Sequence, residues 1–248
     1  MPQYADLSSD EQKQLRDDIR VFIAEKNWEG CGGQAINDEV QVTIAAYACL
    51  LILHIEHNYY PNVESILVYP SGYQAKNRVA DATGVVDEAP AHLLGTAWKQ
   101  GPIALSWIDA ATGAADPKDG HNVILHEFAH KLDLLDGAAD GVPRLESDRE
   151  YDRWADVMHA EYEELVQQSE HGKASLLDSY GATNAAEFFA VATECFFEKP
   201  VPMATTHTRL YEVMKAFYHQ DPCVRIAGRS RTDTAEALAR VKSLINQH

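Results

Sequence analysis

The chain has 248 residues, of which 46% are hydrophobic and 24% are charged, a globular composition whose length suits one large domain or a compact pair. Its formal net charge is −17, from 38 acidic and 21 basic side chains. Because such a surface repels phosphate backbones and anionic lipid, we expect no direct binding to nucleic acid or to a membrane, whereas a basic partner or substrate is compatible with it.

The N-terminus and the cysteines indicate where the protein works. Residues 1–6 lack the basic start and the apolar core of a signal peptide. The longest apolar run, residues 42–55, is too short to span a membrane. The four cysteines form no CxxC pair, so we expect reduced thiols in a cytoplasmic protein.

In chain order, the first half predicts helices separated by short buried strands. Ser8 and Glu11 have the spacing of a capping box, which predicts an amphipathic helix to about Lys26. Residues 38–57 predict a buried helix, although so apolar a run is also compatible with a strand. The other expected elements are buried strands at 64–70 and 103–107, a flexible break at 29–33, a loop at 109–120, and loops over 71–101 with a short strand near 84–86.

The second half predicts mainly helix. Its expected elements are a helix around 123–132, a loop at 137–143, a long helix capped by Ser147 and Glu150 that runs to about Gln168, a helix from Asn184 to Phe197 that Pro200 prevents from continuing, and helices at 208–220 and 234–247. We therefore predict one mainly helical α+β domain over residues 1–248, with a small sheet beside the 123–132 helix and residues 225–248 as a helical C-terminal extension.

Residues 126–130 spell HEFAH, the HExxH pattern of zinc hydrolases. On a helix, His126 and His130 lie one turn apart on the same face and can bind one metal ion, while Glu127 can take a proton from a water molecule at the metal. HExxH fixes only three positions, so a helical protein with a chance motif is the alternative. The apolar flanks favour one zinc ion per chain, because burying these polar groups without a partner is costly, but they do not distinguish zinc from other divalent metals.

Two imidazoles leave the metal short of a protein ligand, for which the candidates are Asp133, Asp136, Glu187 and Glu194. Asp133 shares the helix of both histidines, so we expect it beside the ligands and not on the metal, and Asp136 follows where that helix should end. Glu187 is favoured because it lies in the first turn of a strongly apolar helix, although an acid there is also typical of a cap at Asn184. Glu194 lies on the same face, where it can orient either histidine or form an ordinary ion pair.

Two further features concern the substrate. Tyr180 lies seven residues before Glu187; a tyrosine near a metal can donate a hydrogen bond to a developing oxyanion, although on spacing alone it reads as a packed aromatic. The strand expected at 103–107 precedes the motif helix directly, and as an edge strand it can pair with an extended peptide. Recognition of a substrate with a free amine would need an acidic group; Glu194 and Asp133 are possible, but nothing in the sequence selects either.

Five runs of the chain carry a more specific signal: VTIAAYACL, ILVYP, GPIALSW, NVILHEFAHKLDLLDG and YGATNAAEFFAVATECFF. They resemble the Mlc titration factor A family of bacterial zinc metallopeptidases, over roughly residues 7–222. The resemblance implies a zincin-like core related to the catalytic domain of anthrax lethal factor, a cytosolic peptidase of aminopeptidase type, and binding to the glucose-related repressor Mlc. It assigns zinc to His126, His130 and Glu187, the general base to Glu127, and the transition-state hydrogen-bond donor to Tyr180.

The sequence therefore predicts a zinc-dependent peptidase that acts through metal-activated water and also binds an Mlc-like repressor. The alternative is a regulatory protein that binds the repressor and whose peptidase activity is latent or vestigial. The intact HEFAH motif, together with Tyr180 and Glu187, favours a working catalytic site. A Glu127→Gln variant separates the two hypotheses, because it should lose hydrolysis and keep the partner.

Overall fold

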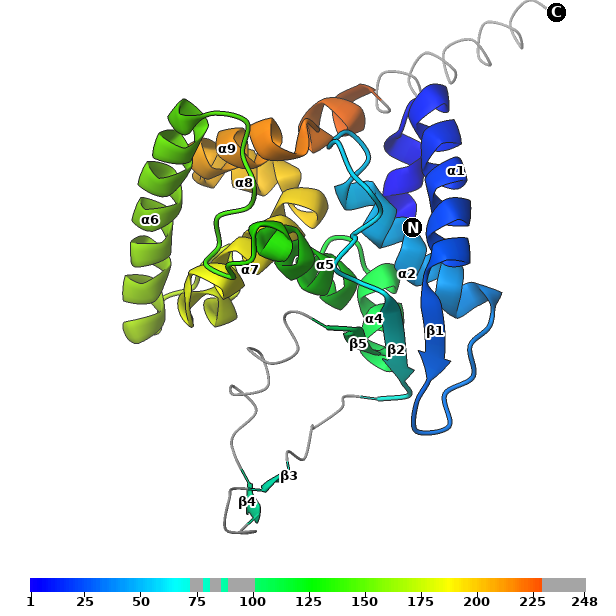
Figure 1. Cartoon of the computed structure of the whole chain (residues 1–248). Coiled ribbons are helices and arrows are strands. Elements are labelled where there is room, and N and C mark those ends of the chain that lie inside the picture. Colours follow the sequence, from blue (N-terminus) through cyan, green and yellow to red (C-terminus); the bar gives the residue numbers. More distant parts are fainter. Residues whose placement is uncertain (72–77, 81–85, 89–100, 229–248) are drawn as a thin grey trace, which may run out of the picture.

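A three-stranded parallel sheet lies at one end of a mainly helical fold (Figure 1). The computed structural model describes residues 1–71, 78–80, 86–88 and 101–228. Strands β1 (Asn27–Gly30), β2 (Ser65–Tyr69) and β5 (Ile103–Ser106) lie in the order β1-β2-β5, and Ile66 pairs with Trp28 on one side and Ile103 on the other. Strands β3 (Arg78–Ala80) and β4 (Val86–Glu88) form a separate antiparallel pair.

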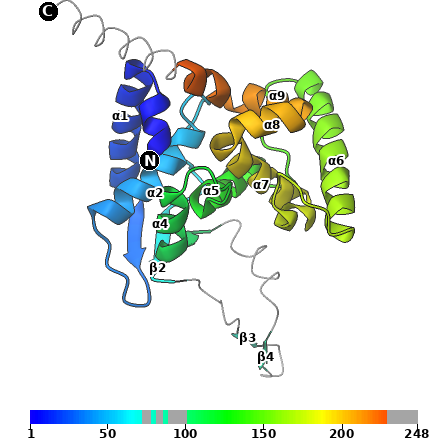
Figure 2. The ribbon, with the colours of Figure 1, turned by 180° about the vertical axis from the view of Figure 1, so that it is seen from behind.

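The helices of the described residues gather around α5, which packs against α2 on one side and α7 on the other (Figures 1 and 2). Strand β5 also contacts α5, so the predicted α+β class, mainly helical with a small sheet beside the motif helix, is confirmed. The helices include α1 (Ser9–Glu25), α2 (Asp38–Leu51), α4 (Trp107–Ala115), α5 (Val123–Asp133), α6 (Asp148–Glu170), α7 (Ala185–Glu198), α8 (Pro200–Thr206) and α9 (Thr208–Tyr218), with 3-10 helices η1 (Pro2–Asp6), η3 (Leu134–Asp136) and η4 (Ser179–Ala182).

Aromatic packing fixes the face of α5 that points away from the histidines. Phe128 is fully buried, and its ring meets those of Phe22 and Tyr60 edge-on, at 5.7 and 4.8 Å between centroids. Because residue 128 follows His126 by two helical positions, it projects from nearly the opposite side of α5. Core packing therefore fixes the orientation of α5 about its own axis, so that its two histidines face α7.

Several predicted boundaries are confirmed by the caps. The Ser8–Glu11 capping box opens α1, and the Asn184 side chain accepts a hydrogen bond from Glu187 N at the start of α7. The predicted segment 38–57 is helical only over Asp38–Leu51, which excludes the strand alternative but ends the helix six residues early. Ser147 occupies the N-cap position of α6, yet its side chain forms no capping bond there, so the predicted box at that helix is wrong.

Two predicted loops are partly regular structure. Residues 29 and 30 belong to β1, not to a flexible break, because the backbone continues the parallel ladder beside β2, with Cys31 N donating to Val68 O at 2.8 Å. Residues 109–115 belong to α4, not to a loop, because the Ser106 side chain accepts a hydrogen bond from Asp109 N and caps that helix. Pro200 ends α7 as predicted but also opens α8, in the first turn where proline is tolerated.

Some predicted elements lie outside the described residues. The predicted helix at 234–247 falls there entirely, and only Val86 of the predicted strand near 84–86 is described, within β4. Among the described helices, none combines the length and the apolar character needed to cross a membrane.

Candidate metal centre

Three potential metal ligands from α5 and α7 converge in the structure. The Oε2 atom of Glu187 lies 3.0 Å from His126 Nε2 and 3.2 Å from His130 Nε2. The ligand atoms of the three residues all lie within 4.8 Å of one another. Each side chain is mostly buried, with 10–14% of its surface exposed. The i, i+4 spacing on α5 supplies the two imidazoles, and the first turn of α7 supplies the carboxylate.

The donor set fits a divalent metal ion. Ligand atoms about 2.0–2.1 Å from a tetrahedral zinc ion lie about 3.3 Å apart, close to both nitrogen–oxygen separations found here. Two nitrogens and one oxygen match the ligands that zinc takes in hydrolases, and they leave one coordination position open. His126, His130 and Glu187 are therefore the residues that would hold the ion.

Glu194 orients the first of the two histidines. Its Oε1 atom accepts a hydrogen bond from His126 Nδ1 at 2.7 Å, and its Oε2 atom accepts one from Asn122 N at 2.5 Å. A proton held on Nδ1 leaves Nε2 as the ligand nitrogen, which is the usual effect of a carboxylate on a metal-binding histidine. Sequence reasoning left open which histidine Glu194 meets, and the crossing of α5 over α7 selects His126. The second imidazole differs, because His130 Nδ1 is buried and has no hydrogen-bond partner among the described residues.

Asn122 ties the start of α5 to the far end of α7. Its side-chain oxygen accepts hydrogen bonds from the backbone N–H groups of Ile124 and Leu125, which caps α5. Its Nδ2 atom donates to Glu198 Oε1 at 2.9 Å. Burial raises the pKa of Glu198 to about 8 despite this hydrogen bond. Sequence reasoning missed Asn122, although an asparagine directly before the apolar motif helix is a cap signal.

Electrostatics within the centre follow from burial and from the close carboxylates. Burial alone would lower the pKa of His126, but hydrogen bonds to Glu187 and Glu194 raise it to about 10. Burial raises the pKa of Glu187, and the two histidine hydrogen bonds more than reverse this, so that its pKa lies well below the usual range. Attraction between these opposite charges compensates for their burial.

Glu127 and Tyr180 lie beside the three candidate ligands. Glu127 follows His126 on α5 and is half-buried, and its charge is felt by both His126 and Tyr180. The Tyr180 ring lies 5.9 Å from the His126 ring, and 54% of the residue is exposed, so it is not a packed core aromatic. Partial burial, followed by the negative charges of Glu187 and Glu127, raises the pKa of Tyr180, so its hydroxyl keeps its proton at neutral pH.

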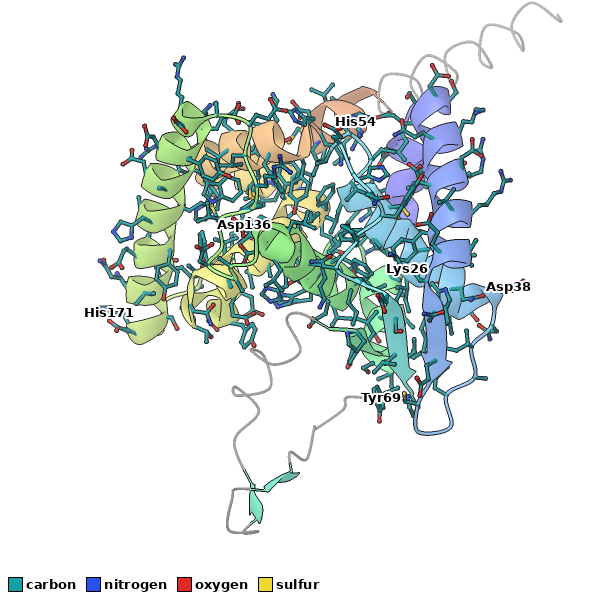
Figure 3. All side chains as sticks on the ribbon, in the orientation of Figure 1. Lys26, Asp38, His54, Tyr69, Asp136 and His171 are labelled. Carbon is teal, nitrogen blue, oxygen red and sulfur yellow. The ribbon has the colours of Figure 1, made fainter. Side chains whose placement is uncertain are left out.

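In the described part of the chain, the other two acidic candidates, Asp133 and Asp136, bond to backbone N–H groups and not to the histidines. Asp133 is fully buried, and both of its carboxylate oxygens accept from Gly141 N at 3.0 Å, so it joins the end of α5 to the 137–143 loop. It forms no described hydrogen bond to a histidine, and burial raises its pKa to about 6. Asp136, labelled in Figure 3, lies exposed in η3, where its side chain accepts from Ala138 N.

Gly141 is a second residue that sequence reasoning missed. Besides its bond to Asp133, its carbonyl accepts a hydrogen bond from Trp154 Nε1 of α6 at 3.0 Å. A side chain at this position would place Cβ 2.4 Å from the carbonyl oxygen of Ala185, the first residue of α7, and its φ is +79°. Gly141 therefore lies where α6 and the end of α5 meet α7, and the α7 residue that it approaches, Ala185, is two positions before Glu187.

Comparison with known proteins places the chain in a family. Residues 1–219 match the family model described as glucose-regulated metallo-peptidase M90. The chain is 40% identical to the protein slr2042 of Synechocystis, over 90% of this chain and 82% of that protein. It is 30% identical to the Mlc titration factor A of Serratia proteamaculans, over 95% and 90% of the two chains, and 32% identical to that of Escherichia coli, over 93% and 87%. The predicted resemblance is confirmed, a metal ion is implied at the candidate centre, and the chain belongs to the glucose-regulated metallopeptidase M90 family.

Proposed function

We propose that this protein is a zinc-dependent peptidase in which His126, His130 and Glu187 hold the metal. The observation that carries the proposal is the approach of Glu187 to both histidine Nε2 atoms, at 3.0 and 3.2 Å, with a carboxylate at Glu127 in the same helical turn. Membership of a metallopeptidase family supports the reaction class. Zinc is the preferred ion because it favours two imidazoles and one carboxylate with an open position.

The side chains around the ligands supply the proton transfers. When bound, zinc would polarise the peptide carbonyl and acidify a water molecule. Glu127 takes the proton of that water as general base and passes it to the amine that leaves. The Tyr180 hydroxyl, kept protonated by its raised pKa, donates a hydrogen bond to the oxygen on which negative charge develops. Glu194 holds the His126 ring in position through Nδ1.

The peptide would lie along β5, which pairs only with β2 in the described sheet and contacts α5. Extended peptides bind such edges by backbone hydrogen bonding. We retain aminopeptidase type as part of the proposal on the basis of the family resemblance. Glu194 and Asp133 are poor binders of the substrate amine, because both are buried and both already accept hydrogen bonds.

The test is metal content together with hydrolysis of a chromogenic aminoacyl anilide by wild type and Glu127→Gln. The expected result is about one zinc per chain in both proteins and activity only in wild type. Glu163→Gln is the matched control, since this exposed glutamate of α6 has no described partner, and it should behave as wild type. Zinc in both proteins with activity in neither would refute catalysis on this substrate, and no zinc in either would refute the metal centre.

Exopeptidase preference needs a separate comparison. The same anilide with an acetylated amine should be hydrolysed much more slowly by wild type if a free N-terminus is recognised. Equal rates on the two substrates would contradict aminopeptidase type and leave the zinc peptidase intact.

A second function, binding of an Mlc-like transcriptional repressor, is supported by relatives that carry the name Mlc titration factor A. Its test is co-purification of the repressor with wild type and with Glu127→Gln. Equal recovery by both proteins is expected, because the partner need not be cleaved. Loss of the partner in Glu127→Gln alone would instead mean that the repressor is bound as a substrate.

The proposal extends to the setting of the centre. We infer a single zincin-like domain that works in the cytoplasm. All four cysteines are free, which is typical of that compartment. A parallel sheet beside the motif helix supports the zincin-like core.

A further inference from the structure

A small polar cavity lies next to η4, the 3-10 helix that carries Tyr180. Its volume is about 290 Å³, enough for one side chain or a short chain end. The wall combines residues that precede α5, the end of α6, the 173–179 segment and the residue after α7. Its polar members include Gly120, His121, Lys173, Asp178, Ser179 and Lys199.

The charge of this cavity is opposite to that of the protein. Two lysines line it, whereas the chain as a whole has a formal charge of −17. Neither Lys173 nor Lys199 has a side-chain hydrogen bond or ion pair among the described residues. Asp178, its acidic lining residue, is already engaged, with His121 Nδ1 at 3.2 Å and with Tyr180 N at 2.7 Å. With Asp178 ionised and His121 neutral, the two lysines leave the cavity wall with one net positive charge.

Lys199 is held in place by a glycine. A Cβ atom at Gly120 would lie 2.8, 2.9 and 3.1 Å from the Nζ, Cε and Cδ atoms of Lys199, so the lysine side chain fills the space of a missing side chain. Gly120 has φ +77°, and its N–H donates to Glu198 Oε2 at 3.1 Å, which fixes this glycine against the end of α7. A lysine fixed in this way loses less conformational entropy when it binds a ligand than a free surface lysine does.

The cavity also lies close to the candidate metal centre. Asp178 and Ser179 directly precede Tyr180, whose ring is 5.9 Å from that of His126. His121 precedes Asn122, which lies four helical positions, or about 6 Å along the axis, before His126. An extended peptide advances about 3.3 Å per residue, so the cavity is about two or three residues from a bond cut at the metal.

We propose that this cavity is a subsite that binds a carboxylate of the peptide substrate, with Lys199 as the main contact and Lys173 as the second. The carboxylate is either an acidic side chain or the C-terminus of a short peptide, which share the same chemistry. This inference rests on the proposed peptidase function, and it names a substrate class for that site: peptides with a negative charge a few residues from the scissile bond.

The test measures binding by calorimetry to full-length, zinc-loaded Glu127→Gln, so that no substrate is consumed. Short alanine peptides carry glutamate or glutamine at successive positions, and each is made with a free or an amidated C-terminus. A charge-assisted contact predicts at least about tenfold tighter binding of the carboxylate form at one position. A preference for glutamate over glutamine would identify an acidic side chain as the ligand, and a preference for the free over the amidated C-terminus would identify the chain end.

Lysine variants assign the preference to the cavity. Lys199→Met keeps the aliphatic stem over Gly120 and should abolish the preference without weakening the neutral peptides, and Lys199→Gln is a second variant in case the first unfolds. Lys118→Met is the matched control, because it removes the same charge from an exposed lysine outside the cavity wall, and it should keep the preference.

The subsite would be overturned by any of three results. These are equal binding of carboxylate and neutral peptides in both arms, a carboxylate preference that survives Lys199→Met, or no binding of any peptide. The proposed function fails by a different readout, which is the absence of hydrolysis of the neutral peptides by wild type.

Discussion

The cap at the start of α5 makes the strongest stability prediction. Replacing Asn122 with alanine removes the one oxygen that accepts both capping hydrogen bonds and leaves Glu198 without its 2.9 Å donor in a buried environment. Loss of an N-cap costs about 1 kcal/mol, and a buried polar partner left unpaired costs about 1–3 kcal/mol. We therefore expect Asn122→Ala to lower the free energy of unfolding by about 3 kcal/mol, or Tm by about 6–12 °C in a chain of this size.

The assay is thermal and urea unfolding beside Asn37→Ala. Asn37 also caps a helix, but it is exposed and its side chain bonds only Val40 N among the described residues, at 3.0 Å, so about 1 kcal/mol is expected. Zinc content of Asn122→Ala at low temperature should be normal, because the backbone N–H of residue 122 still reaches Glu194. Equal destabilisation by the two variants would refute the reasoning that the buried bond to Glu198 matters.

Three further outcomes follow from particular contacts. Gly141→Ala should destabilise the protein by more than about 3 kcal/mol in chemical denaturation, because its Cβ would lie 2.4 Å from a carbonyl oxygen of α7. Gly137→Ala, which has open space around it and φ +96°, should cost only about 1–2 kcal/mol of left-handed strain. Similar costs for the two variants would contradict the clash. Glu194→Gln should weaken zinc binding by about 10- to 100-fold in competition with a chromogenic chelator. The two hydrogen bonds reach different carboxylate oxygens, and the glutamine amide would present a donating NH2 group to one of the two N–H donors; unchanged affinity would count against the orienting role of Glu194. The hydrogen bond to Glu161 raises the pKa of His207 above 6.5, so their pair should stabilise the fold fully below about pH 6.5 and lose this contribution as the pH rises through the raised pKa. The difference in the free energy of unfolding between wild type and His207→Gln should therefore shrink as the pH rises above about 6.5, and a constant difference would exclude the pair.

Local patterns predicted the parts of the fold that depend on short-range physics. The Ser8 box and the Asn184 cap act within a few residues, and both are found as predicted. The i, i+4 spacing of HEFAH likewise places both imidazoles on one face of α5. These features depend on one helical turn each, so no knowledge of the packing was needed.

The features that sequence reasoning missed depend on how distant elements meet. Nothing local distinguishes Gly120 from any loop glycine, because its requirement comes from a lysine at the end of α7. In the same way, β1 is a strand because β2 lies beside it, and the partner of Asp133 is a glycine eight residues away in a loop. Such contacts are set by helix crossing and strand pairing, which residue spacing does not determine.

The placement of the proposed ligands on α5 and α7 has a consequence for how the protein is made. His130 and Glu187 are 57 positions apart, with the whole of α6 between them. At about 5–20 residues per second, about 3–11 s separate their synthesis on the ribosome. During that interval α5 can already pack on α2 and β5, which precede it, while the carboxylate ligand does not yet exist. A growing chain therefore offers an ion two imidazoles at most, and full affinity arises only after α7 has emerged and docked.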